Sequence, residues 1–300
     1  MKIAITGGTG FVGQALTDRL VADGHQVYIL TRNPDKYDDS DKVKYVGWLK
    51  EEHHPEEHLP DLDAIVNLAG ESLNSGRWTE ERKRRILDSR IKATEAIIDL
   101  IEKMDSKPEV LVNASAVGFY GNSKIETFTE DTKDPGRGFL SMVVTEWEKR
   151  ATQATQLGVR TVYARFGIIL GEEGALPKMI LPYKAMIGGK LGSGEQWMSW
   201  VHIDDIVGMI KFAIETPEIS GPFNVTAPNP KRNKDFGKIL GEVLNRPHWI
   251  PAPSFAIKTA LGEMSTLLLD GQCVVPKKAT EHGYQFHYPE LEPALQSILK

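Results

Sequence analysis

The first residues of the chain carry a glycine pattern suited to binding phosphate. A short apolar run, Lys2–Thr6, leads into the segment GGTGFVG at residues 7–13, and an amphipathic pattern follows at once. Three glycines allow a tight turn, close approach of the backbone to a pyrophosphate, and close packing of helix on strand. The free amides at the start of the helix attract the phosphates. Placed between a first strand and a first helix, the motif predicts a dinucleotide site that includes Gly7, Gly10, Phe11, Val12 and Gly13.

A residue farther along distinguishes between the two nicotinamide dinucleotides. In NAD-preferring sites an acidic residue stands about 20 positions beyond the glycines and binds the ribose 2′-hydroxyl. Here the apolar run Gln26–Thr31 ends in Arg32, and the next carboxylate is Asp35. A guanidinium pairs with a 2′-phosphate, which a carboxylate would repel. The sequence therefore favours NADP(H) over NAD, with an ordinary surface arginine as the alternative interpretation.

These residues need a framework that holds them at one edge of a sheet. Short apolar runs alternate with longer segments of helical periodicity, which is typical of βαβ units and a parallel sheet. We expect strands at Lys2–Thr6, Gln26–Thr31, Val43–Gly47, Ala64–Leu68, Val110–Ser115 and Arg160–Ile169, and helices at Val12–Asp23, Thr79–Lys103 and Gly138–Leu157. The predicted fold class is α/β, a Rossmann-type doubly wound parallel sheet with a smaller C-terminal substrate lobe.

The pattern becomes less regular after Gly171, where glycine-rich loops and many prolines interrupt the apolar runs. We expect residues 1–170 to form the dinucleotide-binding domain, with 201–226 returning to it. Residues 171–200 and 227–300 would then form the C-terminal lobe. Ligands usually bind in the cleft between two such units, so a small-molecule substrate is expected there.

Composition excludes several classes of function. With 41 % hydrophobic residues and a formal net charge of −5, the chain lacks the basic excess of a nucleic-acid-binding protein. No run of about 18 uncharged apolar residues predicts a membrane span, and we expect no membrane partner. A single cysteine, Cys273, and an N-terminus that reads directly as a strand favour a cytoplasmic protein. No metal site is expected, and the oligomeric state is not indicated.

Four motifs occur in an order that resembles a known superfamily. The segments TGGTGFVG, the strand ending in Arg32, DAIVNLAG (63–70) and SAVGFYG (115–121) resemble the extended short-chain dehydrogenase/reductases. Longer segments resemble the YfcH family, a divergent branch of NAD-dependent epimerase-like proteins. These segments are NLAGESLNSGRWTEERKRRILDSR (67–90), RFGIILGEEGALPKM (165–179), GSGEQWMSWVHIDD (192–205), GPFNVTAPNP (221–230) and LLLDGQCVVP (267–276).

The resemblance implies further contacts with the cofactor. Small residues at the end of the strand before Gly70 would let a ribose lie against the backbone. The residues implied as cofactor contacts are Thr31, Arg32, Leu68, Ala69, Gly70, Arg85, Arg90 and Ile169. For the basic cluster of residues 82–85, a solvated helix face is the alternative interpretation.

The usual catalytic residues of the superfamily are incomplete. Short-chain reductases use Ser, Tyr and Lys, with the tyrosine as the acid/base. Ser115 matches the serine, or it satisfies local backbone groups; Leu140 and Val144 stand where the tyrosine and lysine belong. Tyr120 followed by Lys124 offers a substitute acid/base, although the intervening residues read as a turn. A wall of the cleft is the other interpretation of Tyr120.

Two functions from different classes remain open. Glu71, Trp78 and Gln196 are expected to line the substrate cleft. Met198 and Ser199 stand where relatives that act on nucleotide sugars tend to carry an arginine, which disfavours such substrates. One hypothesis is an NADP(H)-dependent oxidoreductase or epimerase that acts on a small molecule. The other is a non-catalytic NADP(H)-binding sensor or regulatory protein with a protein partner.

Overall fold

A seven-stranded parallel sheet forms the centre of the computed structural model, which describes residues 1–300. The strand order is β11-β7-β5-β4-β1-β2-β3, and every pairing is parallel. The strands are β1 (Lys2–Thr6), β2 (Gln26–Thr31), β3 (Val43–Gly47), β4 (Ala64–Asn67), β5 (Val110–Ala116), β7 (Arg160–Phe166) and β11 (Gly221–Val225). The chain moves outward from β1 to β3 and then reverses to β4. This order confirms the doubly wound α/β fold and places a ligand crevice at the carboxyl ends of β1 and β4.

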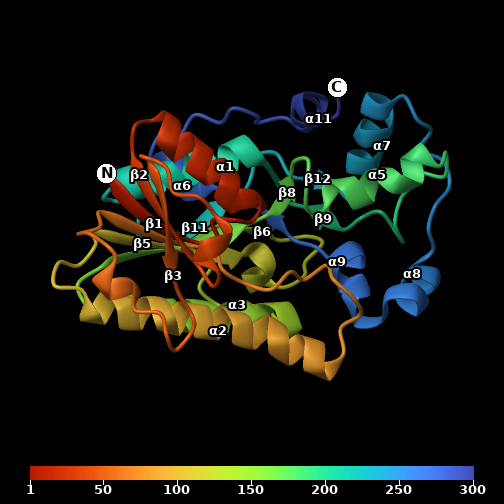
Figure 1. Ribbon diagram of the computed structural model, residues 1–300. Helices are drawn as coiled ribbons and strands as arrows, with labels where there is room; N and C mark the ends of the chain where they lie inside the picture. Colours follow the sequence, from red (N-terminus) through yellow and green to blue (C-terminus); the bar gives the residue numbers. More distant parts are fainter.

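Helices cover both faces of the sheet (Figure 1). On one face lie α1 (Phe11–Ala22) and α6 (Ile203–Glu215), and on the other α2 (Glu80–Lys103), α3 (Phe139–Ala151) and α4 (Gln153–Gln156). Leu16 and Leu20 of α1 pack with Ile3 and Ile5, and Ile97 of α2 lies in a separate core on the opposite face. The strands read as continuous apolar runs because both faces are buried.

The remaining helices, short strands and turns lie outside the central sheet, and several of these helices form the right-hand part of Figure 1. The helices are α5 (Leu176–Lys184), α7 (Asn233–Leu244), α8 (Ser254–Leu261), α9 (Thr266–Leu269), α10 (Lys277–Glu281) and α11 (Leu291–Leu299). Short strands are β6 (Thr127–Phe128), β8 (Ile168–Leu170), β9 (Trp197–Met198), β10 (Trp200–His202), β12 (Lys231–Arg232) and β13 (Cys273–Val274). Single 3-10 turns are η1 (Pro34–Lys36), η2 (Pro55–Glu57), η3 (Val117–Tyr120) and η4 (Gly262–Ser265). A third core, which includes Leu176, Phe236 and Leu291, joins α5, α7 and α11.

Two expected elements are divided in the structure. The run Arg160–Ile169 breaks at Gly167, so that β7 stays in the central sheet while β8 pairs with β10. A Cβ at Gly167 would lie 2.4 Å from the Ser199 carbonyl oxygen, which shows how closely the two segments approach. The helix expected at Gly138–Leu157 is divided at Thr152 into α3 and α4. No helix is both long enough and apolar enough to cross a bilayer.

Candidate functional site: the crevice at the glycine turn

The three glycines of the motif differ in what surrounds them. Gly7 has a φ of +68° and approaches β4 so closely that a Cβ would lie 2.9 Å from Leu68 backbone atoms. At Gly13 a Cβ would lie 2.2 Å from the Gly7 carbonyl oxygen. Gly10 is exposed, and the only atom that its Cβ would meet is that same oxygen, at 3.3 Å. Gly7 and Gly13 therefore allow the turn to pack, whereas Gly10 keeps its outer surface open.

The helix that follows presents unsatisfied amides at this opening. Its N-cap is Gly10, which has no side chain to accept from the first amides, and the first turn holds no acidic residue. These amides and the helix dipole attract an anion. A methyl group at Gly10 would fill the cradle beside them, so the residues present fit the phosphates of a dinucleotide. Val12 is partly buried, and the Phe11 ring lies against Gly171, where a Cβ would be 2.3 Å from Cζ.

Neighbouring strand ends contribute the other predicted contacts. Arg32 follows β2, is exposed, and makes no hydrogen bond or ion pair within the chain. Thr31 is half-buried beside it, and its hydroxyl accepts from the Asn33 amide at 3.4 Å. Because β1 and β2 pair in parallel, Arg32 lies at the same sheet edge as the glycine turn. A free cation thus stands beside the predicted anion site.

The segment after β4 lies at this edge as well. The amides of Leu68 and Ala69 donate to the Thr6 carbonyl and hydroxyl oxygens, at 3.1 and 3.2 Å. Leu68 and Ala69 are half-buried and Gly70 is exposed; Ile169, on β8, is also half-buried. A surface made of backbone and small side chains therefore borders the glycine turn.

Beneath the crevice runs a buried polar ladder that the sequence analysis missed. Its members are Thr6, Asn67 and Asn113, aligned across β1, β4 and β5, together with Thr94 and Trp147 from α2 and α3. The Thr6 hydroxyl donates to Asn67 Oδ1 at 2.6 Å, and Asn67 Nδ2 donates to Asn113 Oδ1 at 2.6 Å. Asn67 Nδ2 and Trp147 Nε1 both donate to the Thr94 hydroxyl, at 3.1 and 2.9 Å. The ladder fixes the strand ends that hold the site. Polar residues within or at the ends of apolar strands were the available signal.

Glu71 and three arginines form a charged cluster beside the crevice. Its carboxylate accepts from Arg82 and, at 2.5 Å, from Arg85. Desolvation acts to raise the pKa of Glu71, but the two arginines together hold it below its usual value. Arg90 donates to the Glu71 and Ile86 carbonyl oxygens at 3.1 and 2.9 Å, and burial lowers the pKa of Arg90 to about 10. Glu71 is thus held by two arginines, and its place facing a substrate stays a prediction.

Trp78 and Gln196 are also committed to internal contacts, contrary to the expectation that they line a cleft. Trp78 is buried, with its Nε1 donating to the Leu73 carbonyl oxygen at 3.0 Å and its ring edge-on to Phe139. Gln196 is 2 % exposed and donates to the Leu191 and Leu268 carbonyl oxygens. Trp78 belongs to an apolar cluster with Ile86, Val143, Leu73, Leu87, Phe139, Leu140, Met264 and Leu267. This cluster joins the starts of α2 and α3 to η4 and α9.

Ser115 belongs to a buried ionic network. Its hydroxyl donates to Glu148 Oε1 at 2.5 Å, and Arg165 donates to both oxygens of the same carboxylate, at 2.8 and 2.7 Å. The Arg165 guanidinium also lies 3.5 Å from the centre of the Phe119 ring. Burial acts to lower the pKa of Arg165, but Glu148 holds it above its ordinary value. Ser115 therefore donates its hydroxyl hydrogen to Glu148, and its role of polarising a substrate carbonyl stays a prediction.

Tyr120 is likewise enclosed. The side chain is 3 % exposed, stacks on Phe128, and donates to Asn224 Oδ1 at 2.7 Å. Burial raises the pKa of its hydroxyl. Gly121, with a φ of +74°, ends the 3-10 turn, so Lys124 does not follow on the same helix face. In this geometry the Tyr120 hydroxyl is hydrogen-bonded within the fold, and its roles as acid/base or as cleft wall stay predictions.

Leu140 and Val144, which stand where the superfamily has its tyrosine and lysine, lie in apolar surroundings. Val144 is 4 % exposed and packs in a core with Val117, Phe119 and Tyr120. Leu140 belongs to the cluster around Trp78 and lies close to Gly118. Neither side chain transfers a proton. No group of three or more His, Cys, Asp or Glu residues is placed to hold a metal ion.

Removing the Tyr120 hydroxyl tests its structural assignment. Tyr120→Phe leaves Asn224 Oδ1 without its donor, so we expect the free energy of unfolding to fall by about 1–3 kcal/mol. Dinucleotide affinity should stay at the wild-type value. Urea unfolding and a fluorescence titration measure the two quantities. Unchanged stability together with a tenfold loss of affinity would show that the hydroxyl belongs to the ligand site.

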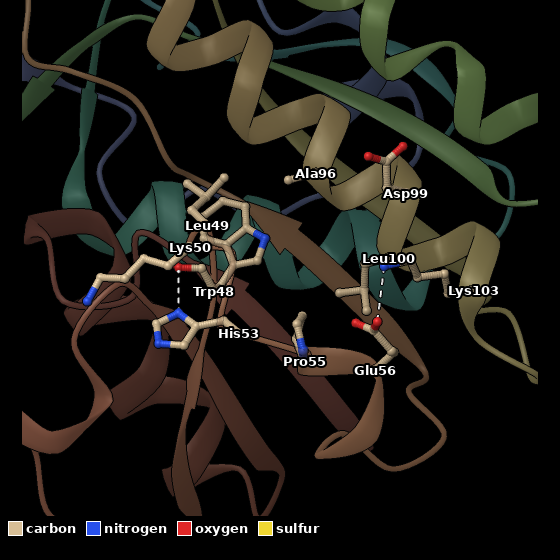
Figure 2. Close-up of a pocket in the computed structure, with 10 residues that line it drawn as sticks. All are labelled: Trp48, Leu49, Lys50, His53, Pro55, Glu56, Ala96, Asp99, Leu100 and Lys103. Carbon is tan, nitrogen blue, oxygen red and sulfur yellow. Dashed lines mark hydrogen bonds and ion pairs between the residues drawn. The ribbon is translucent and has the colours of Figure 1, made fainter.

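A separate cavity lies between the loop after β3 and helix α2 (Figure 2). Its volume is about 180 Å³. The Lys103–Glu56 ion pair and the contact between His53 Nδ1 and the Trp48 carbonyl oxygen are part of its lining. Trp48 is 4 % exposed and its indole nitrogen has no hydrogen-bond partner. No residue of the glycine turn lines this cavity, which is therefore distinct from the crevice.

The fold and the crevice together define a class. A doubly wound parallel sheet, with an open glycine turn between its first strand and first helix, is the architecture of Rossmann-type dinucleotide-binding proteins. Comparison with known proteins shows the family more narrowly. The chain belongs to the NAD dependent epimerase/dehydratase family, which matches residues 3–226, and a domain of unknown function, DUF1731, matches residues 252–298.

Similar proteins extend over the whole chain. Epimerase family protein YfhF of Bacillus subtilis is 52 % identical over 299 residues, covering 100 % of this chain and 98 % of the relative. The crystal structure of human epimerase family protein SDR39U1 with NADPH superposes with a TM-score of 0.86 at 33 % identity, covering 99 % of both chains. A nucleoside-diphosphate sugar epimerase from Corynebacterium glutamicum gives a TM-score of 0.79 at 30 % identity, covering 100 % of this chain and 58 % of that one.

Proposed function

We propose that this protein binds NADP(H) at the glycine turn and uses it as an oxidoreductase on a small, weakly polar substrate. The observation that carries the cofactor assignment is Arg32, an exposed and unpaired guanidinium at the same sheet edge as the open amides of α1. The human relative bound to NADPH supports the same cofactor. The long segments that resemble the YfcH family support placing the chain in that branch, and the buried free thiol of Cys273 is consistent with the cytoplasm.

The geometry supports an assignment of the residues that would hold the cofactor. The amides after Gly10 would bind the pyrophosphate, and Arg32 with Thr31 would bind the 2′-phosphate. Leu68, Ala69 and Gly70 would border a ribose, with Ile169 on the side of β8. The bound nicotinamide supplies or accepts hydride; the protein binds and orients.

The side chains near the crevice favour hydride transfer without a protein acid. Ser115 and Tyr120 are enclosed, and Leu140 and Val144 are apolar. Epimerisation of a sugar begins with removal of a hydroxyl proton by a base, which these residues do not offer. Reduction of a quinone leaves a phenolate-like oxygen, which water protonates readily. Quinones are therefore the substrate class that we propose.

The same enclosed hydroxyls favour one second candidate, a sensor that binds NADP(H) without turnover and signals to a protein partner. Oxidation of NADPH separates the two functions. We expect NADPH consumption with quinones, little with simple ketones, and full activity in Tyr120→Phe. Tight NADPH binding with no consumption on a quinone, aldehyde and ketone panel would contradict the oxidoreductase and favour the sensor.

Arg32→Ala tests the cofactor preference. A hydrogen-bonded charge contact contributes about 1.5–3 kcal/mol, so the affinity for NADPH should fall about 10- to 100-fold while the affinity for NADH changes little. Fluorescence titration of both nucleotides gives the ratio. Arg246→Ala, at another exposed arginine in the C-terminal part, is the matched control and should bind like wild type. Equal loss for both nucleotides would end the 2′-phosphate assignment.

A further inference from the structure

Exposed apolar side chains are concentrated in two segments of the C-terminal part. Eleven large hydrophobic side chains are exposed in the chain, and six of them lie in two segments. These six, which we call the apolar surface, are Leu181, Met186, Ile187, Trp249, Ile250 and Phe255. The other five are scattered from Met1 to Met142. Such a concentration on a protein of ordinary composition indicates an interaction surface.

The two segments run side by side. The amides of Trp249 and Ile250 donate to the Gly188 carbonyl oxygen at 2.9 and 3.1 Å, and the Ala252 amide donates to the Lys190 carbonyl oxygen at 2.9 Å. In Figure 1, α5 and α8, which adjoin these segments, lie on the opposite side of the view from the N-terminus. The apolar surface is therefore remote from the first strands of the sheet.

The charge of these segments is opposite in sign to that of the chain. Residues 176–191 and 245–262 contain no Asp or Glu, although the chain holds 41 and has a net charge of −5. They contain Lys178, Lys184, Lys190, Arg246 and Lys258; Glu173, Glu242 and Glu263 lie just outside. All five cations are exposed, and none belongs to an ion pair of the chain. The surface is both apolar and cationic.

The Trp249 side chain can enter an apolar medium without leaving its indole N–H unpaired. Its ring is 67 % exposed, yet its Nε1 already donates to the Met186 carbonyl oxygen at 2.8 Å. A polar group costs free energy in an apolar medium only where its hydrogen bond is unmade. Phe255, 74 % exposed in the first turn of α8, has no polar atom in its side chain. Both rings can leave water without losing a hydrogen bond.

These features distinguish between possible occupants. A second copy in twofold contact would place the same cations against one another, which is unfavourable. An anionic bilayer accepts both components, because apolar side chains enter the boundary of head groups and acyl chains while cations meet the lipid charge. We propose that this apolar, cationic surface attaches the protein to the surface of an anionic lipid bilayer. Attachment in this mode requires no segment that spans the bilayer.

Vesicle flotation of the full-length protein tests the proposal. We expect binding to vesicles of phosphatidylcholine mixed with phosphatidylglycerol, weakened by salt, and none to phosphatidylcholine alone. Each basic residue near an anionic leaflet contributes about fivefold, so Lys184→Gln with Lys258→Gln should lower partitioning about 30-fold. Lys36→Gln with Lys133→Gln, at exposed sites elsewhere, is the matched control and should change it little.

A second pair of substitutions, at two apolar residues (the apolar pair), tests the contribution of the apolar side chains. Ile187→Ser with Phe255→Ser should lower partitioning about tenfold or more, because two side chains no longer enter the boundary. Ile125→Ser is the control, since Ile125 is 92 % exposed outside the apolar surface. Circular dichroism and NADPH affinity should be unchanged in all variants, which separates failure here from failure of the proposed function.

Four outcomes would overturn the proposal. The first is equal binding to neutral and anionic vesicles, or none to either. The second is an Ile125→Ser defect equal to that of the Ile187/Phe255 pair. The third is binding to poly-L-glutamate as strong as to vesicles and unaffected by the apolar pair, which would indicate an acidic protein partner. An oligomer in sedimentation that the apolar pair dissociates would assign the surface to self-association instead.

Discussion

Replacing Gly10 with alanine is expected to remove most dinucleotide binding while the protein stays folded. The backbone at Gly10, with φ −90° and ψ 174°, suits alanine, and the new methyl would meet only the Gly7 carbonyl oxygen at 3.3 Å. The methyl would occupy the space where a phosphate approaches the amides of α1. Hydrogen bonds to charged groups contribute about 1.5–3 kcal/mol each, so loss of one or two corresponds to about 100-fold in affinity.

Gly13→Ala provides the comparison within the same turn. Its methyl would lie 2.2 Å from the Gly7 carbonyl oxygen and 2.5 Å from Gly8 Cα, both backbone atoms that cannot give way alone. We expect a loss of about 1–3 kcal/mol in stability together with lost binding. Urea unfolding and NADPH titration of both variants separate ligand space from turn packing. Wild-type affinity in Gly10→Ala would refute the assignment of this turn to phosphate.

The second large effect is expected from Glu148→Gln. Glu148 holds the buried Arg165 through two hydrogen bonds and accepts from Ser115. Without the carboxylate, the guanidinium loses its one ion-pair partner, and its Nη1 has no hydrogen-bond partner even in the wild type. Removing one partner of such a pair costs about 3–5 kcal/mol, which denaturant unfolding would detect.

The matched control removes both charges together. Glu148→Leu with Arg165→Met should recover much of the lost stability, because no uncompensated charge remains. Ser115→Ala removes one hydrogen bond and should cost only about 1 kcal/mol. If Glu148→Gln unfolds at the same denaturant concentration as the wild type, the Glu148–Arg165 pair does not stabilise the fold.

Much of the framework could be predicted because it depends on local pattern. The runs at Lys2–Thr6, Gln26–Thr31 and Val43–Gly47 match β1, β2 and β3 residue for residue. These strands are apolar and bounded by glycine or polar residues, so the neighbouring residues indicate where each strand begins and ends. The division at Gly167 could not be predicted, since it depends on the approach of Ser199, a residue distant in sequence.

The side-chain partners in the site escaped prediction for a similar reason. Glu71 reads as a loop acid, and only the fold reveals that Arg82 and Arg85 converge on it. Ser115 and Glu148 come from different elements, and the sequence around each residue gives no indication that the other is its partner. The one available signal was Arg165, a charge near the end of a strand expected in the centre of the sheet, where a buried charge requires a counter-ion.

The Phe11 ring fills the space beside Gly171 in which any larger residue would need to stand. The residues allowed at position 171 therefore depend on the residue at position 11, although the two positions are far apart in the sequence. An aromatic residue at position 11 leaves room only for glycine at position 171. A smaller residue at position 11 would allow a larger side chain at position 171. Among relatives, these two columns of an alignment should therefore change together.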